Sequence, residues 1–142
     1  MLRYRLTHPD ILAALAGAGH GSTVLIADGH YPTSTAACPS AAVVPLNLAA
    51  GVVSVTEVLA VMLDAVTVEA AAVMAPPDAE PAPAVFAAFG ELLPVGMALN
   101  ILDRFAFYRA ARQPDLALLV QTGDVRTYAN ILLTLGVTAS VR

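Results

Sequence analysis

The sequence predicts an α/β fold, a single layered domain in which helices flank a largely parallel sheet. Helical and strand-like patterns alternate along most of the 142 residues, and no internal repeat is present. This alternation is typical of parallel sheets covered by helices. The length suits one domain, residues 1–142, that buries about two thirds of the surface its unfolded chain exposes.

The first part of the chain predicts a helix, a strand and a long loop. Pro9 begins a short helical pattern, since proline suits the first turn of a helix, and glycines end it. Residues 23–27, TVLIA, form an apolar run typical of a buried strand. Residues 29–40 are rich in glycine, proline, serine and threonine, which predicts a loop.

The middle of the chain contains one well-marked helix. Residues 43–53 are apolar but interrupted by a proline, so the sequence does not distinguish a helix from a strand there. Ser54 and Glu57 form a capping-box pattern that predicts a helix over 54–64. In residues 65–74, apolar and polar side chains alternate, which predicts a strand.

A proline-rich stretch, residues 75–83, predicts a surface loop inside the domain, because too little chain lies on either side for two cores. The elements that follow this loop are helices over 83–92 and 103–113, and strands over 116–120 and 128–137. Pro114 ends the second of these helices, and Gly123 and Asp124 supply the turn between the two strands.

Composition limits the partners and the compartment. Only 13% of residues are charged, 58% are hydrophobic, and the net charge is −4. No cluster of lysine and arginine is present, which argues against nucleic acid as a partner. The apolar excess predicts that part of the surface faces another copy of the chain. Cys38 is the single cysteine, so no internal disulfide forms and a cytoplasmic location is expected.

A membrane location is not expected. Residues 41–63 are long enough to cross a bilayer, but they contain a proline, an asparagine and a glutamate. The capping box at Ser54 also starts a new helix inside this stretch. The N-terminus carries two arginines but lacks the apolar core of a signal peptide.

Titratable residues flank the predicted strand 23–27 at both ends. His20 precedes it, and Asp28 and His30 follow it. A strand of five residues spans about 17 Å, so His20 and Asp28 cannot touch along that strand within one chain. His20 and Asp28 can serve one site only if the folding of the chain, or a second subunit, brings the two ends of the strand near different parts of that site. Taken singly, each is also explained as a solvated loop residue or a turn cap.

Two ligand classes are disfavoured by spacing. The glycines at 17, 19 and 21 follow a helix and precede a strand, which is the reverse of a phosphate-binding loop. His20, Asp28 and His30 are residue types that bind zinc, but no paired Cys/His spacing accompanies them. We therefore expect no metal and no nucleotide cofactor.

Three separated stretches carry a resemblance to a known family. The segments AGAGHGSTVLIADGHYP, LDRFAFYRAA and TGDVRTYANILLTLGV occur in this order. Together they resemble the fucose mutarotase and ribose pyranase family over nearly the whole chain. The stretch DRFAFY is nearer to the fucose mutarotase branch. The proline-rich segment 75–83 departs from the family pattern and leaves the exact sugar open.

The resemblance implies a site, a chemistry and an assembly. Family members are rings of identical subunits, typically decamers, with monosaccharide sites at the boundaries between neighbours. His20 matches the catalytic histidine, and His30 matches no assigned role. The residues that match sugar-binding positions are Asp28, Arg104 and the segment Tyr128, Ala129 and Asn130.

The implied chemistry suits these residue types. Opening a sugar ring and closing it on the other face needs proton transfers, which a histidine can carry near neutral pH. Asp28 and Arg104 can fix hydroxyl groups through charge-assisted hydrogen bonds. The sequence thus predicts an aldose mutarotase acting on L-fucose or a similar sugar. The alternatives are a pyranose–furanose isomerase of the ribose pyranase type, a non-catalytic sugar-binding ring, and a metal-dependent enzyme using His20, Asp28 and His30.

Overall fold

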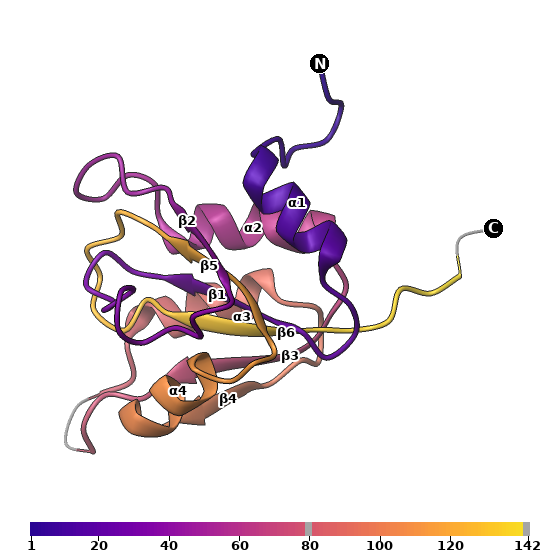
Figure 1. Cartoon of the computed structure of the whole chain (residues 1–142). Coiled ribbons are helices and arrows are strands. Elements are labelled where there is room, and N and C mark those ends of the chain that lie inside the picture. The colour runs from indigo at the N-terminus through magenta and orange to yellow at the C-terminus, as the bar shows by residue number, and fades with distance from the viewer. Residues whose placement is uncertain (79–80, 141–142) are drawn as a thin grey trace.

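Six strands form one mixed sheet with helices on both faces in the computed structural model, which describes residues 1–78 and 81–140 (Figure 1). The strand order is β2-β5-β1-β6-β3-β4. The α/β class is thereby confirmed. The strands are β1 (Thr23–Ala27), β2 (Ala42–Pro45), β3 (Val68–Met74), β4 (Leu99–Leu102), β5 (Leu116–Gln121) and β6 (Ile131–Leu135).

The sheet is parallel apart from one strand. β1 pairs with β5, β2 with β5, and β3 with β4 in parallel, whereas β6 runs antiparallel to both β1 and β3. The reversal follows from the connection between β5 and β6, which is a short loop without a helix. A parallel return needs a crossover of a dozen residues or more, so a short connection brings the chain back in the opposite direction.

Four helices cover the two faces of this sheet (Figure 1). On one face, Ile11, Leu59 and Phe89, one from each of the first three helices, join a core with side chains of β1, β3 and β6. On the other face, Phe107 from the fourth helix packs with Tyr31 of the loop after β1. The helices are α1 (Pro9–Gly17), α2 (Val55–Ala65), α3 (Ala84–Leu92) and α4 (Arg104–Ala111).

The local signals in the sequence are confirmed at the helix starts. The Ser54 hydroxyl accepts a hydrogen bond from the backbone N–H of Glu57, and the Glu57 carboxylate accepts one from the backbone of Ser54. Asp103 caps α4 by accepting from the backbone N–H groups of Phe105 and Ala106, both at 2.9 Å. These bonds satisfy N–H groups that a helix start leaves unpaired.

Two strands differ from expectation, and β3 and β6 are both shorter than the strands predicted over 65–74 and 128–137. Residues 42–45 form β2, which overlaps the start of the stretch 43–53 for which no conformation is predicted, and residues 99–102 form the unpredicted β4. β4 lies at the sheet edge with no fully buried residue, so it lacks the strong apolar run by which strands are found. The final strand is shorter than predicted, because residues 128–130 belong to the loop before β6.

The predicted surface loop over 75–83 joins β3 to α3, and residues 79 and 80 lie outside the described part of the chain. Residues 41–63, long enough to cross a bilayer, are divided among β2, a loop and α2. Within the described residues, no helix has both the length and the apolar character needed to cross a bilayer.

Candidate functional site

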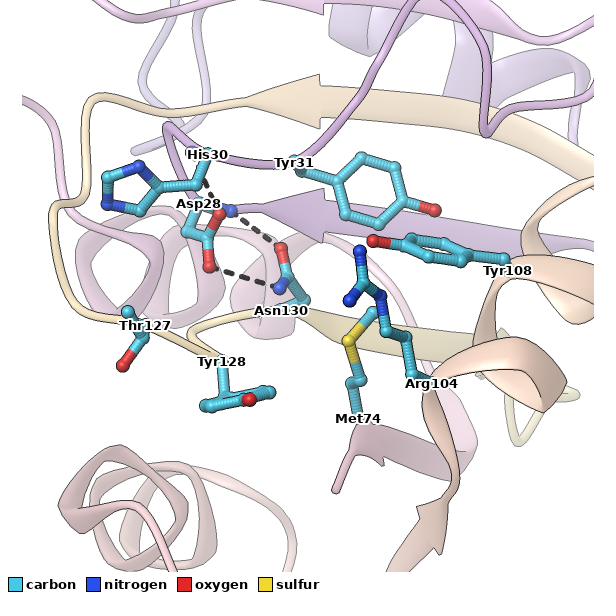
Figure 2. Close-up of a pocket in the computed structure, with 9 residues that line it drawn as sticks. All are labelled: Asp28, His30, Tyr31, Met74, Arg104, Tyr108, Thr127, Tyr128 and Asn130. Carbon is cyan, nitrogen blue, oxygen red and sulfur yellow. Dashed lines mark hydrogen bonds between the residues drawn. The ribbon is translucent and has the colours of Figure 1, made fainter. Parts of the chain in front are cut away.

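A pocket opens at one end of the sheet, where β1, β3 and β4 end and where β6 begins (Figure 2). The antiparallel direction of β6 brings its first residues to the edge reached by the last residues of its neighbours. The cavity volume is about 220 Å³. Its lining residues are Asp28, His30, Tyr31, Met74, Arg104, Tyr108, Thr127, Tyr128 and Asn130.

Asp28 and Asn130 hold each other in place on one wall of the pocket (Figure 2). The backbone N–H of Asp28 donates to Asn130 Oδ1 at 2.8 Å, and Asn130 Nδ2 donates to Asp28 Oδ2 at 3.0 Å. The backbone N–H of His30 donates to Asp28 Oδ1 at 2.9 Å. These bonds fix the orientation of the amide and use one lone pair of each carboxylate oxygen, so both oxygens keep acceptor capacity.

The electrostatics of Asp28 follow from its burial. Its exposed fraction is 2%, and its hydrogen-bond donors are neutral amides. Burial raises the pKa of the Asp28 carboxyl above its ordinary value, and the bonds from His30 and Asn130 only partly oppose this rise. A buried carboxylate that faces a cavity favours a ligand that supplies further hydrogen bonds.

Arg104 brings a positive charge to the opposite wall. Because Asp103 serves as the N-cap of α4, the Arg104 side chain is free to extend into the pocket. Its guanidinium carbon lies 5.6 Å from the centroid of the Tyr108 ring, within the range of a cation–π contact. Figure 2 shows Arg104 reaching toward Tyr108 and Tyr31. The rings of these two tyrosines pack edge to face, with their centroids 5.7 Å apart. The pocket therefore presents a carboxyl group, a guanidinium group and the phenol rings of three tyrosines.

Tyr128 adopts an unusual backbone conformation beside the pocket. Its φ of 61° lies in the left-handed region, which costs a non-glycine residue about 1–3 kcal/mol. Such strain often occurs at ligand sites. The next residue, Ala129, has no exposed surface and packs into the core, so its side chain does not line the cavity. In the segment 128–130, Tyr128 and Asn130 therefore line the pocket, whereas Ala129 lies in the core.

A second aspartate lies nearby, at the end of β5. Asp124 Oδ2 accepts a hydrogen bond from the backbone N–H of Val55 at 2.9 Å, which caps α2, and pairs with Arg126 at 2.6 Å. Burial alone would raise the pKa of Asp124. The bonds from Arg126 and Val55 outweigh burial, and the pKa lies below its ordinary value. Asp124 therefore anchors the loop between β5 and β6 to α2.

His20 lies at the opposite edge of the sheet, in the turn before β1. Its side chain is 59% exposed, and its Nε2 lies 3.0 and 3.1 Å from the two carboxylate oxygens of Glu69. Asp28, Arg104, Tyr128 and Asn130 are gathered in one pocket, whereas His20 is not among its lining residues.

The arrangement does not form a metal site within one chain. His20 is separated from Asp28 and His30 by the length of β1. Throughout residues 1–78 and 81–140, no three histidine, cysteine or acidic side chains are grouped so as to hold a metal ion.

Four pocket residues were not assigned a role from the sequence: Tyr31, Met74, Tyr108 and Thr127. Tyr31 and Thr127 lie in loops beside predicted site residues, which is the one signal that could have found them. Met74 ends a strand and Tyr108 lies on α4, so only the fold brings them to the cavity. His30 also lines the pocket, and its Nε2 lies 3.2 Å from the Val125 carbonyl oxygen.

Comparisons with known proteins place this fold and these segments among sugar-related relatives. A model of the RbsD / FucU transport protein family matches residues 1–138. A D-ribose pyranase of Paracidovorax citrulli is 34% identical over 138 residues, covering 97% of this chain and 99% of that protein. A fucose mutarotase of Danio rerio is 32% identical over 143 residues, covering 91% and 88%. The crystal structure of the Streptococcus pneumoniae fucose mutarotase in complex with L-fucose gives a TM-score of 0.80 at 23% identity, over 93% and 94% of the two chains.

Proposed function

The chain belongs to the RbsD / FucU family, as the sequence resemblance indicated, and from this premise we propose that it is a sugar isomerase. Its proposed reaction is the interconversion of the α and β anomers of L-fucose or a similar aldose. One observation carries the proposal, the convergence of Asp28, Arg104, Tyr128 and Asn130 on a single small pocket.

The size and chemistry of the pocket suit one monosaccharide. Its volume of about 220 Å³ is below that of clefts for drug-sized ligands, which are about 300–1,000 Å³. Asp28 offers acceptors and Arg104 offers a planar fork of donors, and a sugar hydroxyl can both donate and accept. The rings of Tyr108 and Tyr128 offer apolar surface to the C–H faces of a sugar.

We assign His20 as the group that carries protons. When the ring opens, the C1–O5 bond breaks, the ring oxygen gains a proton, and the anomeric hydroxyl loses one as C1=O forms. His20 carries one of these transfers and water carries the other, and the same transfers run backwards when the ring closes on the other face. The net proton count is zero, and no hydride, phosphoryl group or electron moves. The proposed reaction therefore needs no cofactor or metal.

The separation of His20 from the pocket supports a site shared between subunits. In this proposal, His20 of one subunit reaches the pocket of a neighbour in a ring, as the sequence resemblance implied. Exposed apolar side chains give such a ring surfaces to bury. They include Leu48, Val52, Val95, Ile101, Phe105 and Val125. Cytoplasmic location is part of the same proposal and is supported by the single free cysteine, Cys38.

Arg104 is the reason to propose a fucose-like sugar first. Relatives named as D-ribose pyranase and as fucose mutarotase are similarly close to this chain, so identity alone does not select the sugar. Arg104 belongs to the DRFAFY stretch that resembles the fucose mutarotase branch, and its side chain lines the pocket. The second candidate is a pyranose–furanose isomerase acting on D-ribose, favoured by the identity to a D-ribose pyranase.

Exchange NMR between anomers, run over a panel of aldoses, tests the function directly. We expect faster anomer exchange for L-fucose than for D-ribose, and faster pyranose–furanose exchange of D-ribose would favour the second candidate. His20→Ala should reduce exchange by about 10²- to 10⁴-fold, because general acid–base groups contribute that much. His30→Ala is the matched control and should cost much less. Equal losses in both variants would contradict the assignment of His20, and sugar binding without exchange in the unaltered protein would identify a non-catalytic binding ring.

Mixed assemblies test whether subunits share the site. The His20→Ala and Asp28→Ala variants are each inactive in the proposal. Co-expressed in equal amounts, they should regain about one quarter of the unaltered activity, because random neighbours in a ring pair an intact His20 with an intact Asp28 in that fraction of sites. No recovery in mixed rings would place both residues in sites of a single subunit. A mass near 14.6 kDa by light scattering, that of one chain, would contradict the ring itself.

A further inference from the structure

We propose that Glu69 is a positioning residue for His20, holding the imidazole with its proton on Nε2 so that Nδ1 faces the sugar. This inference rests on the proposed function, because it takes His20 as the proton carrier. Glu69 lies outside the three sequence segments that resemble the family, and the inference also assigns the reacting nitrogen.

The backbone aims Glu69 at His20. The pairing of β3 with β6 shifts register between Val68 and Ala70, which leaves Glu69 as the extra residue of a bulge. A bulge turns a side chain away from the regular alternation of a strand and is common beside active sites. The carboxylate of Glu69 then lies with both oxygens near His20 Nε2, at 3.0 and 3.1 Å.

Gly136 leaves room for the Glu69 side chain. A Cβ at position 136 would lie 3.1 Å from the Cβ of Glu69 and 3.5 Å from its Oε2. The first distance is tighter than a normal carbon contact, so a larger residue here would require Glu69 Cβ or its surroundings to shift by a few tenths of an ångström.

The turn that carries His20 is fixed to the same part of the sheet. The backbone N–H of Gly21 donates to the Leu135 carbonyl oxygen at 2.9 Å, and the N–H of Leu135 donates to the Ser22 carbonyl at 2.9 Å. The His20 turn is thus bonded to the end of β6, and β6 pairs with the start of β3. The two side chains meet because main-chain hydrogen bonds bring their segments together.

The chemistry of the pair selects one tautomer. An ionised carboxylate only accepts hydrogen bonds, so the nitrogen that faces it must carry a proton. His20 Nε2 is that nitrogen, and Nδ1 has no hydrogen bond among the described residues. A neutral His20 therefore presents an unprotonated Nδ1. That nitrogen takes the proton from a sugar hydroxyl as the O–H bond breaks, while the Nε2–H bond to Glu69 stays intact. A carboxylate that orients a catalytic imidazole in this way occurs in the serine protease triad.

We expect the contact between Glu69 and His20 to contribute little to the stability of the fold. Both side chains are about half exposed, 59% for His20 and 45% for Glu69, and exposed pairs contribute little to stability. Removing the carboxylate should therefore leave the thermal unfolding midpoint unchanged. An effect on the reaction then cannot be attributed to unfolding.

The first test reads the tautomer without reference to activity. In protein labelled with ¹⁵N-histidine, at a pH where the imidazole is neutral, the His20 ring shifts should show a proton on Nε2. In Glu69→Ala the two tautomers should become mixed. A proton on Nδ1 in the unaltered protein, or an unchanged spectrum in Glu69→Ala, would overturn the inference.

The second test measures exchange kinetics in the intact assembly. Glu69→Ala should lower kcat about 2- to 5-fold with KM within about twofold, the effect expected from losing one partly exposed charged contact. Glu69→Gln keeps an acceptor oxygen and should lose less, which provides a second variant of nearly native shape. Glu91→Ala removes another exposed carboxylate, from α3, and should change nothing.

The outcomes separate the inference from the proposed function. If His20→Ala retains full exchange, the catalytic role of His20 fails and the positioning role of Glu69 fails with it. If His20→Ala is inactive but Glu69→Ala has the unaltered kcat, the proposed function stands and the role of Glu69 is overturned. Equal losses of kcat in Glu69→Ala and Glu91→Ala would attribute the effect to the change in net charge, and would also overturn the positioning role of Glu69.

Discussion

Two buried aspartates at the same edge of the sheet show how one residue type takes two different roles. Asp28 follows β1 and Asp124 follows β5, which are neighbouring parallel strands. Their exposed fractions are nearly equal, 2% and 3%. Asp124 has a partner of opposite charge in Arg126 and caps α2, and its pKa lies below the ordinary value. Asp28 has neutral donors, and burial raises its pKa.

The difference lies in what the chain itself supplies. Asp124 receives its opposite charge from a residue two positions away, so its ionised form is satisfied without a ligand. Asp28 faces Arg104 across an open cavity, and the ion pairs of the described chain do not include either residue. Burial by itself therefore does not mark a binding group. An aspartate that the fold buries without an opposite charge is the better candidate.

The largest expected effect is the loss of turnover in Asp28→Ala. Hydrogen bonds to a charged group contribute about 1.5–3 kcal/mol each, so losing two bonds to a sugar should cut kcat/KM by about 10²- to 10⁴-fold. The unfolding midpoint should fall less than in Asp124→Ala, because removing Asp28 also removes an unfavourably buried carboxylate. Anomer-exchange NMR and thermal melts measure the two effects. Retained turnover would reduce Asp28 to a turn residue.

The matched variant Asp124→Ala should show the opposite pattern. It removes the ion pair to Arg126 and leaves the buried N–H of Val55 without a partner. Loss of a helix cap costs about 0.5–2 kcal/mol, and an unsatisfied buried donor about 1–3 kcal/mol. We expect the free energy of unfolding to fall by about 2–4 kcal/mol, measured by urea denaturation. Turnover per folded subunit should fall far less than in Asp28→Ala, and a loss of the same size would mean that both aspartates serve the site.

Arg104→Lys sharpens the comparison from the other side of the pocket. The substitution keeps the charge opposite Asp28 but loses the planar fork of donors and weakens the contact with Tyr108. We expect about tenfold lower kcat/KM for fucose-like sugars, equivalent to the loss of about one hydrogen bond, with assembly unchanged by light scattering. Unchanged kinetics over the aldose panel would show that recognition rests on Asp28, Tyr128 and Asn130.

The smallest effects are those of pH on stability, and they have opposite signs for the two aspartates. The raised pKa of Asp28 gives a contribution to stability that is full below the ordinary value of 3.8 and is lost as pH rises through the raised pKa. The lowered pKa of Asp124 gives a contribution that is full above 3.8 and is lost as pH falls through the lowered pKa. Carboxyl ¹³C titration by NMR should find the Asp28 midpoint above that of Asp124. The reverse order would contradict the comparison.

The sequence predicted the features that depend on neighbours along the chain. The capping box at Ser54 and Glu57 involves residues three positions apart, and it is present. The contact between Asp28 and Asn130 joins residues 102 positions apart, and no local pattern contains it. The prediction that both belong to one site came from resemblance.

The pairing of His20 with Glu69 shows the same limit. It depends on a bulge and on the direction of β6, and both follow from strand pairing. Met74 and Tyr108 reach the pocket for the same reason. β3 ends, and α4 begins, at the same end of the sheet. The sequence marked the chemistry of several residues, and the sheet order decided which of them meet.

The central place of the last strand has a consequence for folding. β6 lies between β1 and β3, so in the described sheet the strands β2, β5 and β1 are joined to β3 and β4 through β6. β1 can pair with β5, and β3 with β4, before β6 pairs with β1 and β3. Pairings of such large sequence separation form slowly. Until they form, the inner edges of β1 and β3 lack a partner and can pair with strands of other chains. Truncation before residue 131 should therefore yield aggregation-prone protein without the wall that Asn130 shares with Asp28.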